Sequence, residues 1–401
     1  MMKEVGRKPK ILLLTQYFYP DITAASFRMY ELYKYLLNEG FEIEVVTTNV
    51  HRSNAKLVIE DSHDIHRVMV HFASQKNKLR YIYYYLEFVI KSLVIILKNR
   101  LFGCELIFVS SPPIFVAIEA LFLSLLFRKK LLLDVRDLWP DSVVDVGKIK
   151  VNSVIYNILK RVERILYRKA SRVFCVSQPM KEYILAYTSN VTVVYNGISN
   201  YDFLKFKDKP TLTNGGSPFN VFYAGNVGMA QTLDFVFDAA DELQKENNVS
   251  FIFHIIGEGV KLKDYQEIVE KNKLENVIFH KSLLREELLD YLYQNADILL
   301  LPLKRGFSFE KTIPSKLFDY LLLKEPIVYH VYGECREILL KLHIGEEFEL
   351  NGEGFLNALQ EIASNYGWYQ KNAQENNFQL LKGFLRETQF QKVLEAINGL
   401  Y

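Results

Sequence analysis

Short apolar runs alternate with amphipathic patterns along the chain, which predicts parallel sheets built from strand–helix–strand units. Residues 11–14 form the first apolar run, apolar positions then recur at helical spacing from Phe27 to Leu37, and Gly40 ends that helix. The same alternation continues through the first half, with further strands expected at 41–48, 104–111, 130–137, 172–177 and 191–197.

A second series of alternating elements begins at residue 219 with a strand, a glycine-containing loop and a helix. The polar segment 199–218, which ends in Gly-Gly-Ser-Pro and has no hydrophobic period, is interpreted as a linker. We therefore predict an α/β fold of two Rossmann-like domains, each a doubly wound parallel sheet, facing one another across a cleft. Ligands of such sheets bind beyond the carboxyl ends of the strands, so the loops there carry the candidate chemistry.

Composition and charge exclude several classes of protein. With 401 residues, 49% hydrophobic and 14% aromatic, the chain is too apolar to be disordered and too long for one core. A total of 49 Lys and Arg against 47 Asp and Glu gives a net charge of +2, so we expect no nucleic-acid partner. Three widely spaced cysteines, a start without a leader-like apolar run and no spanning stretch favour a cytoplasmic protein.

The sharpest local signal for chemistry lies in residues 312–326. Ser315, preceded by Pro314, is expected to be the N-cap of a helix, with Lys316 in the first turn and Asp319 on the same face. A helix N-terminus with a lysine favours a phosphate, and a carboxylate one turn later can accept hydrogen bonds from sugar hydroxyls. Ordinary capping with a surface ion pair is the alternative. Against it, the capping-box position is aromatic, and a lone cation in the first turn is unfavourable without an anion.

Glycine-containing loops follow two strands of the second half. Gly225 and Gly257 allow a ligand to approach the backbone closely, and Asn226 supplies a neutral donor. A tight turn explains the second of these loops equally well.

Two loops of the first half also carry candidate residues. The small Ala24 and Ala25 lie on a long first loop, where bulk would block a ligand, and Arg28 follows at the start of the helix. Arg136 and Asp137 come just after an apolar strand, and we place Asp137 in the cleft. The alternative for this loop is a group of acids that solvate a strand end.

The sequence contains no HExxH motif, no D-x-D triplet and no His/Cys cluster at ligand spacing, so neither a metal site nor a cofactor is expected. Two segments instead predict contact with a membrane. Residues 76–100 hold six Lys or Arg and one Glu among several tyrosines, and residues 159–172 again hold six basic residues and one acidic residue. Basic, aromatic helices of this kind bind anionic lipid. The alternative is a core helix with a solvated edge.

These motifs together resemble the retaining glycosyltransferases of family 4, which have the GT-B architecture, and among them the bacterial enzymes of capsule and O-antigen assembly. The resemblance covers most of the chain and depends on the order and spacing of its parts, which include YFYPDITAASFRMYELYKYLLNEGFEIEVVTT, LDVRDLWPDS, FYAGNVGMAQTL, HIIGEG, ADILLLPL and IPSKLFDYLLLKEPIV.

The resemblance implies an acceptor-binding domain at 1–205, a nucleotide-sugar-binding domain at 206–385 and a C-terminal helix at 386–401 that packs back on the first domain. Its motif positions imply that Lys316 and the Ser315 amide hold the diphosphate, Asp319 the ribose, and the loop at Lys281 and Ser282 the base. Gly225, Asn226 and the Gly257 loop would line the diphosphate and sugar, and the Ala24–Ala25 loop would close over them. Arg28 and Arg136 are assigned to the acceptor or sugar side.

The chain departs from the pattern of many family members at four positions. Two glutamates spaced eight residues apart correspond here to Lys311 and Asp319, and an Arg and a Lys correspond to Asn226 and Gln231. A histidine of the family corresponds to Arg136. These differences leave fewer cations for the diphosphate.

The resulting hypothesis is a retaining, metal-independent hexosyltransferase. Its donor would be a nucleotide diphosphate sugar, UDP-linked, and its acceptor a lipid-linked or growing saccharide of the cell surface. It would work in the cytoplasm, at the inner face of the cell membrane. Two alternatives remain: a sugar-nucleotide epimerase on the same scaffold, and a non-catalytic partner subunit that binds nucleotide.

Overall fold

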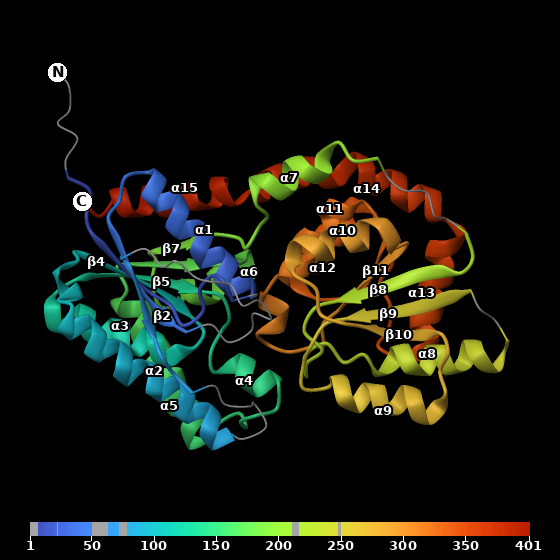
Figure 1. The fold of residues 1–401 in the computed structure, drawn as a ribbon, viewed down its shortest axis with the longest axis horizontal. Coiled ribbons are helices and arrows are strands. Elements are labelled where there is room, and N and C mark those ends of the chain that lie inside the picture. The colour runs from blue at the N-terminus through green and yellow to red at the C-terminus, as the bar shows by residue number, and fades with distance from the viewer. Residues whose placement is uncertain (1–6, 22, 50–62, 72–77, 211–215, 248–249) are drawn as a thin grey trace. The chain divides into compact units, whose positions relative to one another are not determined.

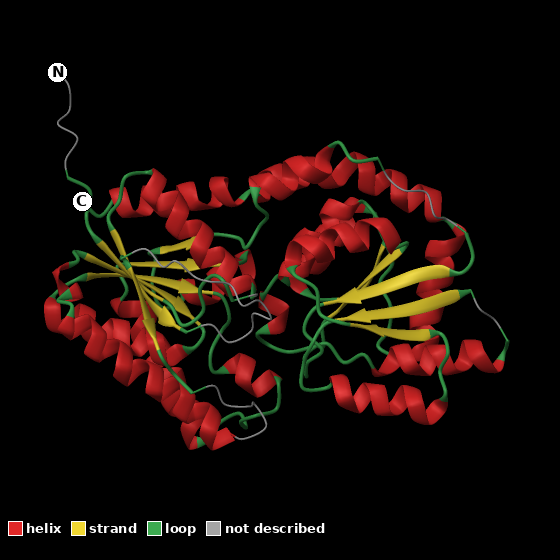
Figure 2. Cartoon of the chain, viewed as in Figure 1, coloured by secondary structure: helices red, strands yellow, loops and turns green. Residues whose placement is uncertain are grey.

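The computed structural model describes residues 7–21, 23–49, 63–71, 78–210, 216–247 and 250–401, without the side chains of 78–82. The chain divides into two compact units (Figures 1 and 2). The first comprises Met1–Tyr195 and Gln389–Tyr401, and the second comprises Asn196–Thr388. Both contain parallel sheets, as the alternating pattern predicts.

The first unit is a seven-stranded parallel sheet in the order β3-β2-β1-β4-β5-β6-β7. Its strands are β1 (Ile11–Leu14), β2 (Ile43–Thr48), β3 (Ile65–Val68), β4 (Leu106–Ser111), β5 (Lys130–Val135), β6 (Arg172–Cys175) and β7 (Val191–Val193). Its helices are α1 (Ala24–Asn38), α2 (Lys78–Lys98), α3 (Ile114–Phe127), α4 (Asp141–Asp145), α5 (Val154–Lys169), α6 (Gln178–Leu185) and most of α15 (Arg386–Asn398).

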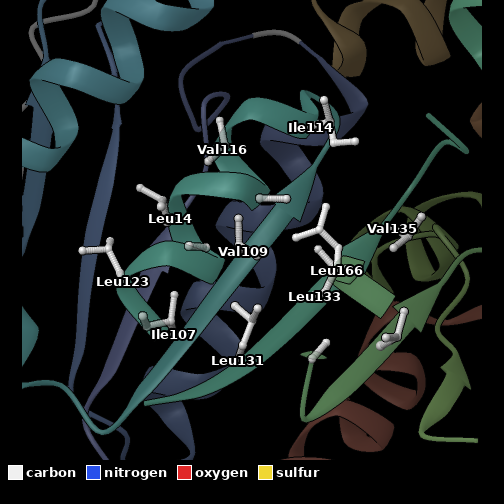
Figure 3. Packing of buried hydrophobic residues seen from close by; sticks show 14 of the residues in the cluster. Leu14, Ile107, Val109, Ile114, Val116, Leu123, Leu131, Leu133, Val135 and Leu166 are labelled. Carbon is white, nitrogen blue, oxygen red and sulfur yellow. The ribbon is translucent and has the colours of Figure 1, made fainter. Parts of the chain in front are cut away.

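Helices cover both faces of this sheet because alternate strand residues point to opposite sides. Helices α2, α3, α5 and α6 pack on one face; in Figure 3, Val116 and Leu123 of α3 lie over Val109 and Ile107 of β4. Helices α1 and α15 pack on the other face, where Phe390 belongs to the core.

The second unit is a five-stranded parallel sheet in the order β10-β9-β8-β11-β12. Its strands are β8 (Phe219–Ala224), β9 (Phe251–Ile256), β10 (Val277–His280), β11 (Ile298–Pro302) and β12 (Ile327–His330). Its helices are α7 (Asn200–Lys207), α8 (Asp234–Lys245), α9 (Leu262–Asn272), α10 (Arg285–Asn295), α11 (Ser315–Leu323), α12 (Gly333–Leu342), α13 (Gly352–Ser364) and α14 (Tyr366–Leu381). Helices α8 and α13 belong to the core on one face of this sheet.

The segment interpreted as a linker, 199–218, is partly helical, which corrects the sequence interpretation. Ser199 caps α7 by accepting a hydrogen bond from the Asp202 amide at 3.0 Å, and Phe203 and Phe206 are buried. Two aromatic residues three positions apart are too short a pattern to show a helical period. Because α7 packs within the second unit, the boundary falls at 195/196, ten residues before the expected 205/206.

We predict that Phe390→Ala destabilises the first unit by about 3–5 kcal/mol, because a buried aromatic side chain leaves a cavity when it is truncated. The chain has two tryptophans, so a Trp368→Phe background leaves Trp139 as the reporter of the first unit during urea unfolding. Gln391→Ala, at an exposed position of the same helix, is the control. Equal urea midpoints for the two variants would show that α15 adds nothing to this core.

Candidate functional site

The strand order of the second unit reverses at β8, which lies between β9 and β11. In open parallel sheets this reversal opens a crevice at the carboxyl ends of the two central strands, where ligands bind. The loop after β8 and the loop between β11 and α11 border this place, and the Lys304 amide donates to the Ala230 carbonyl between them at 2.8 Å.

Two glycines bring the loops after β8 and β9 into backbone contact. The Gly225 amide donates to the Ile256 carbonyl at 2.8 Å, and both Gly225 (φ 131°) and Gly257 (φ 146°) have backbones that other residues rarely adopt. A Cβ at Gly257 would lie 1.8 Å from the Gly225 carbonyl oxygen. Glycine is therefore required at 257, which accounts for the second loop by packing alone.

Gly225 has a different role, because the side chain of Lys316 lies against it. A Cβ at Gly225 would lie 2.5 Å from Cε and 3.0 Å from Nζ of Lys316. The ammonium also lies 3.7 Å from the centre of the Tyr223 ring. No carboxylate of the described residues forms an ion pair with it, and burial lowers the pKa of Lys316 to about 7. The side chain of Lys316 is therefore packed against Gly225 and Tyr223, and no described residue provides its counter-ion.

The helix that carries Lys316 begins one residue earlier than the sequence predicts. Pro314 (φ −56°, ψ 132°) occupies the N-cap position and Ser315 is the first helical residue, so Ser315 is not the cap. The extended backbone of the proline moves the start of the helix. The first amides of such a helix have no intrahelical partner and carry partial positive charge. Tyr320 fixes this helix on the sheet, since its hydroxyl accepts from the Ala224 amide at 3.1 Å.

Asp319 lies on the same helix but has a partner that the sequence does not suggest. Arg285, the first residue of α10, donates from Nη2 to Asp319 Oδ1 at 2.6 Å and from Nη1 to Asp202 Oδ2 at 2.5 Å. The side chains of Asp202, Arg285 and Asp319 are 4%, 19% and 28% exposed, so Asp319 is the outermost of the three.

The remaining donor-side candidates lie on loops of the second unit. Lys281 and Ser282 follow β10 directly, Lys281 is exposed, and Arg285 begins the helix three residues after Ser282. Asn226 is exposed in the loop after β8. The neighbouring Gln231 has a buried Oε1 atom that accepts no hydrogen bond.

In the first unit, Arg28 is committed to a buried ion pair. Its guanidinium binds both carboxylate oxygens of Asp134, at 2.9 and 3.3 Å, and the carbonyls of Val194 and Tyr195, and the side chain is 3% exposed. These four hydrogen bonds join α1 to β5 and to the segment after β7. The geometry therefore gives Arg28 a structural role, while contact with an acceptor remains a prediction.

Arg136 and Asp137 lie together after β5. Arg136 donates to Ser110 Oγ and to the Pro112 carbonyl, both at 3.0 Å, and so holds the loop after β4. Burial raises the pKa of Asp137, and Arg136 opposes that shift. No described donor binds the Asp137 carboxylate. Among the described residues of this loop, the Asp137 carboxylate is therefore available to bind a ligand.

Ala24 and Ala25 belong to a helix and not to the long loop expected at 14–28. Helix α1 begins at Ala24 because Thr23 caps it, accepting a hydrogen bond from the Ser26 amide at 3.2 Å. Arg28 consequently lies one turn inside the helix.

Two residues were not predicted from the sequence: Arg285, which binds Asp319, and Tyr223, whose ring lies against Lys316. A cation at the start of a helix opposes the helix dipole, which is the same signal that marked Lys316, so the sequence did contain an indication for Arg285. Tyr223 is indistinguishable from other strand aromatics without the fold.

Two features are absent from the described residues. No three His, Cys, Asp or Glu side chains there are grouped so as to hold a metal ion. In the same part of the chain, no helix combines the length and the apolar character needed to cross a membrane.

Comparison with known proteins adds family information to this geometry. The model of Glycosyltransferase Family 4 matches residues 25–200, and that of Glycosyl transferases group 1 matches residues 218–365. WcaI of Escherichia coli K12, named as a glycosyl transferase of colanic acid biosynthesis, is 23% identical over 334 residues, 78% of this chain and 81% of its own. WbjE of Pseudomonas aeruginosa, named as a glycosyltransferase, is 26% identical over 215 residues, half of each chain.

Solved structures share the fold over nearly the whole chain. Sucrose-phosphate synthase from Thermosynechococcus elongatus is 14% identical with a TM-score of 0.72, covering 98% of this chain and 99% of its own. HepE of Anabaena, solved in complex with UDP-glucose, is 15% identical with a TM-score of 0.68, covering 98% and 100%. The two matched domains, one in each parallel-sheet unit, together with this shared architecture, identify the chain as a glycosyltransferase of the GT-B fold.

Proposed function

We propose that the protein transfers a sugar, with retention of anomeric configuration, from a UDP-sugar to a lipid-linked or growing saccharide in cell-surface polysaccharide synthesis. The observation that carries the proposal is the ammonium of Lys316 at the start of α11, which lies against Gly225 and forms no ion pair with a carboxylate of the described residues. Two comparisons support the finer assignments. A relative is named for colanic acid biosynthesis, and HepE was solved with UDP and with UDP-glucose.

The chemistry assigned to this site is stabilisation of the departing diphosphate. When the bond between the anomeric carbon and the β-phosphate oxygen breaks, negative charge develops on that oxygen. Lys316 and the first amides of α11 present positive charge for it without reorganising. Asp319 would accept hydrogen bonds from the ribose, and Lys281 with Ser282 would contact the base. Asp137, whose carboxylate accepts no hydrogen bond from the described residues, would orient the acceptor. No metal or resident cofactor is part of this proposal.

Two measurements separate transfer from the alternatives. A UDP-sugar incubated without acceptor stays intact with a transferase, whereas an epimerase changes its sugar. A non-catalytic subunit would bind UDP in calorimetry and give no product with extracted lipid acceptors.

We propose in addition that the first unit lies on the inner face of the cell membrane. Helices α2, α3 and α5 pack on one face of the seven-stranded sheet, and Figure 1 shows them grouped there. Each leaves large apolar side chains exposed on its outer side, namely Leu86, Ile90, Val94 and Leu97 on α2, Phe122, Leu125 and Leu126 on α3, and Val154, Ile155, Ile158 and Ile165 on α5.

The charges on α5 favour an anionic partner. Arg161, Arg164 and Arg168 are exposed, while the acid of this helix, Glu163, is buried and accepts from Lys160 at 2.7 Å. An apolar surface with basic residues at its edge suits a bilayer of anionic lipid. Of the two segments predicted from the sequence, the side chains of 76–82 lie outside the described residues, and α3 was not foreseen as part of this surface.

Lys160 links α5 to α4, the short helix that follows the loop of Arg136 and Asp137. From α5 it also binds Asp141, the first residue of α4, four positions after Asp137. An acceptor lipid bound at the exposed face of α5 would therefore lie on an element that is tied to the segment following Asp137.

Lys316→Ala should lower turnover by about 10²-fold or more, the scale of a lost charge-stabilising donor. Turnover would be measured with UDP-sugar and a membrane extract containing the acceptor. Lys271→Ala, which removes an exposed lysine of α9, should leave turnover unchanged. Turnover of the Lys316 variant close to that of the control would refute the assignment.

UDP binding should weaken as pH rises from 7 to 9. Burial lowers the pKa of Lys316 to about 7 in the free protein, and a bound diphosphate raises it, so binding takes up a proton in this range. Affinity should fall by up to about tenfold per pH unit, measured by calorimetry. The phosphates of UDP are already ionised there, and Lys316→Arg, which stays charged, should bind independently of pH. If the affinity of the wild type for UDP stays the same from pH 7 to 9, the assignment is contradicted.

The protein should sediment with anionic liposomes at low salt and be released at high salt, because surface charges are screened. Ile90→Asp combined with Phe122→Asp should abolish sedimentation. Leu37→Asp, at an exposed apolar position of α1 on the other face of the sheet, is the matched control. Equal sedimentation of both variants, or none by the wild type, would remove the membrane proposal.

A further inference from the structure

The Arg285 side chain bridges two carboxylates that come from different helices. Nη1 donates to Asp202 of α7 at 2.5 Å, and Nη2 donates to Asp319 of α11 at 2.6 Å. Ser199 donates from Oγ to the same Asp202 oxygen at 2.6 Å. The result is a series of hydrogen bonds, Ser199–Asp202–Arg285–Asp319, that runs from the capped start of α7 to α11.

Exposure along this chain shows which acid can meet a ligand. The side chain of Asp202 is 4% exposed and its Oδ2 already accepts two hydrogen bonds, so it serves as the fixed end. Asp319 is 28% exposed, and its described bond uses Oδ1 alone. Oδ2 of Asp319 is therefore the oxygen available to a hydroxyl group, and Arg285 determines how it is turned.

The local charge balance also depends on Arg285. Asp319 lies three residues after Lys316 on the helix proposed to hold a diphosphate, and an uncompensated carboxylate there would repel that ligand. The guanidinium offsets this charge, while Asp202 keeps it in place on the buried side. A guanidinium is suited to this position because its planar fork can bind two carboxylates at fixed angles, which an ammonium cannot do.

We propose that Arg285 is a positioning residue that presents Asp319 to the ribose hydroxyls of the donor, and so sets the preference of the site for a ribonucleotide. This inference rests on the proposed function, in which Asp319 binds ribose. Arg285 lies outside the motif of residues 312–326. Its proposed role can be tested through the preference for UDP over 2′-deoxy-UDP, which a purely structural ion pair would not change.

The test compares the affinities of UDP and 2′-deoxy-UDP, measured by calorimetry on the full chain. Arg285→Ala should weaken UDP binding by roughly tenfold, the effect of losing a hydrogen bond to a charged group, and 2′-deoxy-UDP binding by less than about twofold. Asp319→Asn should reduce the same discrimination, and the double variant should equal the single ones, because both substitutions remove one interaction. Arg285→Lys keeps the charge without the fork and should also lose discrimination, which covers a failure of the alanine variant to fold.

The matched control is Asp290→Asn, which breaks another tie between α7 and α10. Asp290 of α10 binds Lys205 at 2.6 Å and Lys209 at 3.0 Å, away from Asp319. It should leave the ratio of the two affinities unchanged.

The possible results separate the two claims. If Asp319→Asn removes discrimination and both Arg285 variants keep it, the positioning role is wrong and the ribose assignment stands. If Asp319→Asn keeps discrimination, or the wild type has none, the ribose assignment fails and the Arg285 proposal fails with it. If the Arg285 variants weaken the binding of UDP and of 2′-deoxy-UDP equally, the ion pairs of Arg285 only hold the helices together.

Discussion

The rest of this site depends on a buried ammonium, that of Lys316, which has no carboxylate partner in the part of the chain that the structure describes. Burying a lysine disfavours its charged form, and the low pKa of Lys316, about 7, reflects that cost. The fold nevertheless prepares a place for the side chain. Gly225 leaves room that any Cβ would fill, Tyr223 offers its ring face, and Tyr320 fixes the helix on the sheet. A bound anion, such as a diphosphate, would supply the missing counter-ion and so account for this arrangement.

Comparison with Arg28 shows why the unpaired charge is informative. Arg28 is also a buried cation, but Asp134 and two backbone carbonyls use its donors, which makes it part of the scaffold. Arg285 is intermediate, because it is anchored on the buried Asp202 and turned toward the more exposed Asp319. The arrangement of partners, more than residue type, distinguishes a residue that holds the fold from one that meets a ligand.

The sequence predicted the two parallel sheets and a helix beginning near Ser315, because apolar periodicity and capping residues are local signals. It did not predict α7, whose two buried phenylalanines are too few to show a helical period, nor the start of α11 at Ser315, because Pro314 takes the N-cap position. The ion pair of Arg28 could not be predicted, because its partner Asp134 is 106 residues away in the sequence. Pairings of this kind depend on which strands become neighbours, and no local pattern contains that information.

The most direct test of the central claim is a crystal structure of the protein with UDP. The account predicts diphosphate oxygens within hydrogen-bonding distance, about 2.7–3.2 Å, of Lys316 Nζ and of the first amides of α11. A diphosphate bound elsewhere, or Lys316 turned away from a bound nucleotide, would contradict it.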